Sequence, residues 1–185
     1  MFVEARKFSS DVSSWDVSGL TNLNQIFNKA NVFNSDVSSW DVSSAEYMKF
    51  MFQDAFEFNS DVSSWDVSSV GNMYGTFTKA SVFNSDVSSW DVTAVSRIQY
   101  MFQEAIEFNS DVSSWDITSV TEINNMFDGA AQYDRRMCDW NLSGKGKSNM
   151  FRNSPCTEVK CVDCPSTSSP TTWPKISPTT DYYFY

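Results

Sequence analysis

A period of 25 residues runs through most of the chain and constrains the fold more than any other feature. Residues at equivalent positions of successive repeats, here called a lane, show it most clearly. One lane is Trp15, Trp40, Trp65, Trp90, Trp115 and Trp140, and another is Phe2, Phe27, Phe52, Phe77, Phe102 and Phe127. The segment FNSDVSSWDVS is identical at 33–43 and 58–68. Because one short unit cannot bury its own apolar face, such repeats stack on one another. We therefore expect the aromatic lanes to form the core.

Within each unit, the spacing of apolar residues predicts one strand and one helix. Trp65, Asp66 and Val67 alternate apolar, polar and apolar, as in a short strand whose tryptophan and valine point inward. Met73 and Phe77 are four residues apart and Ala80 follows three later, which is the spacing of one helical face. The prediction is an α/β right-handed solenoid of about six 25-residue coils, with parallel strands on one face and short helices on the other.

The repeat, written MFxxAxxFNxDVSSWDVSxVxxM, resembles that of BspA-type leucine-rich repeat surface proteins, also called the bacterial surface protein repeat of about 26 residues. The resemblance covers approximately residues 1–152. It implies a leucine-rich-repeat-like solenoid, a secreted or cell-surface location and a role in adhesion. It carries over no catalytic residue.

Charge and composition exclude several classes of function. The chain has 13 Lys and Arg against 23 Asp and Glu, and no histidine. The acidic surplus argues against nucleic-acid binding, which needs clustered basic residues. The absence of histidine removes Ser/His/Asp relays and HExxH zinc sites. Carboxylates are plentiful, but identical copies in identical surroundings do not separate their pKa values, so we predict that the protein is not an enzyme, with a glycan-active enzyme only a distant alternative.

One row of aspartates is predicted to lie on the exposed strand face. It consists of Asp16, Asp41, Asp66, Asp91 and Asp116, flanked by serines such as Ser39, Ser64 and Ser89. At strand spacing, neighbouring carboxylates repel by about 3 kcal/mol before screening by salt. Three remedies are open: hydrogen bonds to each aspartate, protonation of some, or a bound cation such as calcium at Asp41, Asp66 and Asp91. This face is the predicted binding surface for a protein or glycan.

Two further ladders have a structural interpretation. Asp11, Asp36, Asp61, Asp86 and Asp111 lie in the predicted return turns beside Asn34, Asn59, Asn84 and Asn109. Short Asp and Asn side chains in turns normally bond to backbone groups. Glu4, Lys29, Asp54, Lys79 and Glu104 alternate in sign, and we expect them to pair across coils and fix the register.

The end of the chain departs from the repeat. Cys138, Cys156, Cys161 and Cys164 favour two disulfides in a C-terminal cap, with a four-cysteine zinc site as the alternative. Asn141-Leu142-Ser143 is a sequon, which makes Asn141 a candidate glycosylation site. The predicted organisation is a solenoid at 1–137, the cap at 138–164 and a Ser/Thr/Pro-rich linker or stalk at 165–185.

The sequence predicts an extracellular or cell-surface binding module. The alternative is a structural spacer without a specific ligand. The chain opens in phase with the repeat, at Met1, so we expect it to be a fragment of a longer protein. It has no apolar run of spanning length, so we expect no transmembrane segment in this chain.

Overall fold

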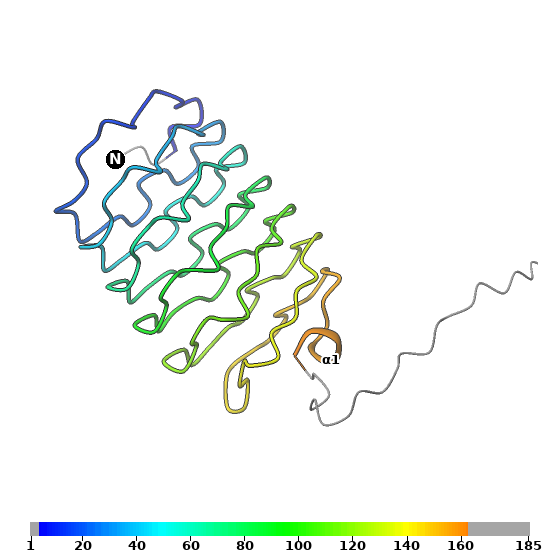
Figure 1. Cartoon of the computed structure of the whole chain (residues 1–185). Coiled ribbons are helices and arrows are strands. Elements are labelled where there is room, and N and C mark those ends of the chain that lie inside the picture. Colours follow the sequence, from blue (N-terminus) through cyan, green and yellow to red (C-terminus); the bar gives the residue numbers. More distant parts are fainter. Residues whose placement is uncertain (1–3, 163–185) are drawn as a thin grey trace, which may run out of the picture.

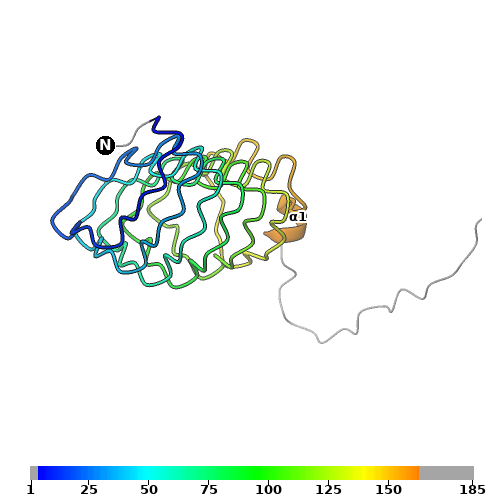
Figure 2. The ribbon, with the colours of Figure 1, turned by 90° about the horizontal axis from the view of Figure 1, so that it is seen from above.

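The chain winds into successive coils that lie side by side in sequence order. The computed structural model describes residues 4–162. Both views show the coils following one another from the N-terminal end to the short helix α1 (Glu158–Cys161) at the other end (Figures 1 and 2). Equivalent residues of neighbouring repeats therefore lie next to each other along the stack.

The predicted α/β class is wrong. Within residues 4–162, α1 is the only α-helix, and β-pairing is confined to isolated parallel bridges that form no sheet. These bridges make a single column that joins one residue of each coil to the next: Asn22, Tyr47, Asn72, Arg97, Glu122 and Gly146. The stack is thus built of turns and extended segments rather than of parallel strands backed by helices.

The predicted helices do not form because their backbone N–H groups point to the next coil. The amides of Met73, Phe77 and Lys79 donate to carbonyls 24 residues ahead, at 2.7–2.9 Å. In an α-helix each would donate to the carbonyl four residues before it. Lys79 also has a φ of 61°, in the left-handed region, which ends any right-handed helix. The three- and four-residue spacing comes instead from tight turns, such as Ala80 N–H to the Phe77 carbonyl at 3.0 Å.

The predicted strands do not pair, and backbone donors at both ends of each segment are used within the same coil. The amide of Trp65 donates to the Val62 carbonyl at 3.2 Å, and that of Ser68 to Asp66 Oδ1 at 3.1 Å. Side chains replace the missing ladder: Trp65 Nε1 donates to the Val37 carbonyl of the preceding coil at 3.0 Å. Trp65 and Val67 are nevertheless buried and Asp66 exposed, so the predicted inward and outward directions are confirmed.

Stacked aromatic rings fill the interior, as predicted from the lanes. Phe77 is fully buried, and its ring centroid lies 3.9 Å from that of Phe83 and 5.7 Å from those of Phe52 and Phe102. The tryptophans from Trp40 to Trp140 are 3–4% exposed, whereas Trp15 of the first coil is 37% exposed. Offset stacking adds to the free energy gained by burying these large rings.

The C-terminal end is closed by a disulfide and an ion pair. Cys156 and Cys161 are bonded to each other and buried, so the sulfur of Cys161 is not available to a zinc ion in this structure. Cys138 is also in a disulfide. Asp128, 3% exposed, accepts two hydrogen bonds from the guanidinium of Arg152 at 2.5 and 3.0 Å.

Some predictions fall on residues outside 4–162. Cys164 and the Ser/Thr/Pro-rich stretch 165–185 lie beyond the described part. Between Glu4 and Val162, no helix is long and apolar enough to cross a membrane.

Candidate functional site

The predicted aspartate row is exposed on successive coils, and every member is held in the same way. In each case, Oδ1 accepts a hydrogen bond from the backbone N–H two residues later. For Asp66 this bond to Ser68 is 3.1 Å long, and the Ser68 hydroxyl donates to the same oxygen at 2.6 Å. The row, here called the Asp row, comprises Asp16, Asp41, Asp66, Asp91 and Asp116. One carboxylate oxygen of each residue is thus fixed by a local turn.

These hydrogen bonds keep the row ionised. The Ser68 hydroxyl and amide hold the pKa of Asp66 below its ordinary value, because they stabilise the charged form. The neighbouring carboxylates Asp41 and Asp91 raise that pKa by a smaller amount. Of the three ways to relieve the repulsion between neighbouring carboxylates, hydrogen bonding is therefore present. Because these bonds stabilise the charged form, they oppose protonation, which is the second way.

The flanking serines tie the coils together. Ser39, Ser64 and Ser89 are exposed, and each hydroxyl donates to a backbone carbonyl of the preceding coil, at 3.0–3.2 Å. Their hydroxyl protons are therefore used within the fold, and the oxygens are left as acceptors on the surface.

The Asp row does not form a compact cage for a cation. Within residues 4–162, one group of three candidate ligands has its atoms within 4.8 Å of one another, namely Asp134, Cys156 and Cys161. Two of those ligands are the sulfurs of the disulfide. Three carboxylates of the row do not come together at that distance, so a calcium ion on Asp41, Asp66 and Asp91 would need ligands from water or a partner.

The two other ladders have structural roles. Asp61 Oδ1 accepts from the Ser63 amide at 2.9 Å, and Asn34 Oδ1 accepts from the amide of Asn59 in the next coil at 2.8 Å. The latter bond recurs from Asn59 to Asn84 and from Asn84 to Asn109, which confirms the predicted asparagine ladder. In the alternating charge ladder, Lys29 pairs with Glu4 at 2.6 Å and Lys79 with Glu104 at 3.9 Å.

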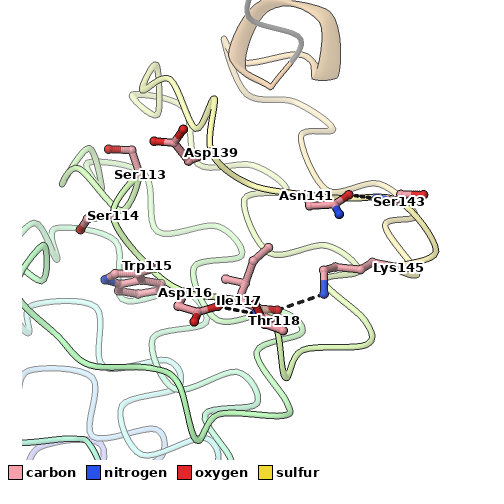
Figure 3. A pocket seen from close by; sticks show the side chains of 10 residues that line it. All are labelled: Ser113, Ser114, Trp115, Asp116, Ile117, Thr118, Asp139, Asn141, Ser143 and Lys145. Atoms are coloured by element: carbon pink, nitrogen blue, oxygen red, sulfur yellow. Dashed lines mark hydrogen bonds between the residues drawn. The ribbon is translucent and has the colours of Figure 1, made fainter.

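A pocket of about 460 Å³ lies at the C-terminal end of the Asp row, between the last two coils (Figure 3). Its lining residues are Ser113, Ser114, Trp115, Asp116, Ile117, Thr118, Asp139, Asn141, Ser143 and Lys145. Lys145 Nζ donates to the carbonyls of Ile117 and Val120 at 3.0 and 2.5 Å, and its charge helps to lower the pKa of Asp116 after the larger effect of the Thr118 hydrogen bonds.

Asn141, the sequon asparagine, occupies the Asp-row position of the last coil. It is exposed, and its Oδ1 accepts from the Ser143 amide at 3.0 Å, so an asparagine keeps the same local turn as the aspartates. From the sequence, Asp116 and Asn141 are separate candidates, and no motif predicts the pocket that joins them. Asp139 and Lys145 were missed, although both differ from their equivalents in the earlier repeats.

Among the comparisons with known proteins, one family model matches the chain, in two places. The family model described as Mycoplasma protein of unknown function, DUF285, matches residues 1–83 and again residues 59–161. No curated protein and no solved structure is detectably similar to the chain. The two family matches overlap and together cover all the coils described above, so the chain belongs to the DUF285 family.

Proposed function

We propose that the chain is a cell-surface or secreted binding module that presents the Asp row to a protein or glycan partner. The observation that carries this proposal is the set of ionised, outward-facing carboxylates that local turns hold in one orientation on successive coils. Groups fixed before binding lose little conformational freedom in a complex. Stacked repeats commonly use such extended surfaces for recognition.

Two further points support a secreted or cell-surface location. Disulfides persist mainly in oxidising compartments, and Cys156 and Cys161 form one. The repeat resembles that of BspA-type surface proteins, which are linked with adhesion. A spacer that projects another module is the competing function, and it needs no binding face.

The test uses a triple variant in which asparagine replaces Asp41, Asp66 and Asp91. Asn141 keeps the same turn in the last coil, so the variant is expected to fold with an unchanged melting temperature. We expect its affinity for any partner found in a screen of glycans and surface proteins to fall roughly tenfold or more, because charge-assisted hydrogen bonds are lost. Binding is measured by biolayer interferometry, with calcium and with EDTA.

The matched control replaces Asp36, Asp61 and Asp86 with asparagine, which removes the same charge from the return turns. Its affinity should stay within about twofold of the unmodified chain. Equal losses in both variants would assign binding to net charge and contradict the proposed face. A chain that captures nothing in the screen would be a spacer.

A further inference from the structure

The last coil departs from the repeat at three positions whose side chains all line the pocket. Asp139 stands where the earlier coils have Ser14, Ser39, Ser64, Ser89 and Ser114. Asn141 replaces the aspartate of the Asp row, and Lys145 takes a position that is otherwise apolar, as in Leu20, Ala45, Val70, Val95 and Val120. In an array of nearly identical units, this is where a site with its own specificity would differ from its neighbours.

Folding accounts for only part of these departures. Lys145 caps two carbonyls at the end of the stack, which is a structural task of a terminal repeat. Asp139 has no comparable structural role. In the preceding coil the hydroxyl of Ser114 donates a hydrogen bond to the Ser88 carbonyl, and an ionised carboxylate has no proton with which to make this bond. Replacing a donor that ties two coils together with a carboxylate brings a negative charge to the pocket wall.

The pocket offers both donors and acceptors. Asp139 and Asn141 lie along one side of it, and Asp116 and Lys145 along the other (Figure 3). Asn141 uses its oxygen for the turn, which leaves its NH₂ group to donate. Lys145 has three ammonium protons, of which two carbonyls take two. The carboxylates of Asp116 and Asp139 supply acceptors, and the hydroxyls of Ser113 and Ser143 can do either.

The charged side chains that line the pocket narrow the chemical class of ligand that it can bind. Two carboxylates disfavour an anion, and no three metal-ligating side chains gather at this pocket, whose lining residues all lie within 4–162, to hold a bare cation. The polar side chains of the lining disfavour a wholly apolar molecule, whereas the volume falls within the range of small-ligand pockets, roughly 300–1,000 Å³. We propose that this pocket binds a neutral, hydroxyl-rich ligand, namely one sugar residue of a glycan. The inference rests on the proposed function, since it names the ligand class at one end of the same face.

The test uses the full chain from a bacterial host, in which the sequon at Asn141 stays unmodified. The probes are free glucose, galactose, mannose and N-acetylglucosamine, and binding is followed by saturation-transfer NMR and titration. The variant combines Asp139→Ser with Asn141→Asp. It restores both repeat residues, keeps the net charge, and is expected to restore the serine bond and retain the turn, so it should fold normally.

We expect at least one sugar to bind the unmodified chain, and its affinity to drop about tenfold or more in the double variant. Asp61→Asn, outside the pocket, should leave sugar binding unchanged. Absence of binding by all four sugars, or equal binding by the double variant, would overturn the inference. Neither result would affect the partner-binding comparison of the two triple variants, so failure here is distinguishable from failure of the proposed function.

Discussion

Replacing Phe77 with alanine is expected to lower the free energy of unfolding by about 3–5 kcal/mol, which is the usual cost of truncating a buried phenylalanine. Phe77 is fully buried, stacks on Phe83 within its own coil, and contacts Phe52 and Phe102 of the neighbouring coils. The cavity would therefore open between three coils at once. Urea unfolding followed by tryptophan fluorescence measures the loss.

Phe56 provides the control for this substitution. Its side chain is 43% exposed and belongs to no buried lane, so Phe56→Ala should change the free energy of unfolding by less than about 0.5 kcal/mol. Equal losses at the two positions would mean that the aromatic stack is not the source of stability.

Gly75→Ala is expected to destabilise the fold by about 2–4 kcal/mol. Gly75 has a φ of 62°, where an alanine loses about 1–2 kcal/mol to left-handed strain. An added Cβ would also collide with the ring of Phe50, and overpacking of this kind costs about 1–3 kcal/mol. Were the segment a helix, as the spacing of Met73 and Phe77 predicts, the same change would stabilise it by about 0.5–1 kcal/mol.

Gly71→Ala is the matched control. No atom lies closer than 4.0 Å to the Cβ that it would add, and its φ is not in the left-handed region. We expect its melting temperature to match that of the unmodified chain within about 2 °C. A stabilising effect of Gly75→Ala would contradict the turn geometry described for this segment.

Burial could be predicted from the sequence because each lane repeats without a slip. The period alone placed Trp65, Phe77 and Ala80 inside, and alternation placed Asp66 outside. These predictions depend on which side chains avoid water, and that is insensitive to the local backbone conformation. The asparagine ladder of Asn34 and Asn59 was predictable for a similar reason, since a short amide in a turn seeks a backbone partner.

Helices and strands could not be predicted in the same way. Apolar spacings of three and four residues are shared by helices and by consecutive tight turns, and only the backbone bonds distinguish them. Bulky residues also adopt left-handed φ here, as Phe50 and Tyr100 do at 55° and 61°. Such conformations are uncommon outside glycine and asparagine, so the sequence carries no local signal for them.

The site was predictable where it repeats and not where it is unique. The exposed Asp row follows from the period, whereas the pocket depends on how the last two coils meet. A position-by-position comparison of the last unit with the others would have singled out Asp139 and Lys145. Their convergence on one pocket with Asp116 and Asn141 could be seen only in three dimensions.

The central claim is that the repeat forms stacked coils of turns without helices. Far-UV circular dichroism of the full chain tests it most directly, read together with the amide I infrared band, to which the stacked aromatic rings contribute little. We expect no pair of helical minima at about 208 and 222 nm, because residues 4–162 contain a single helix of 4 residues. A spectrum with strong helical minima, matching one short helix in every coil, would contradict this account.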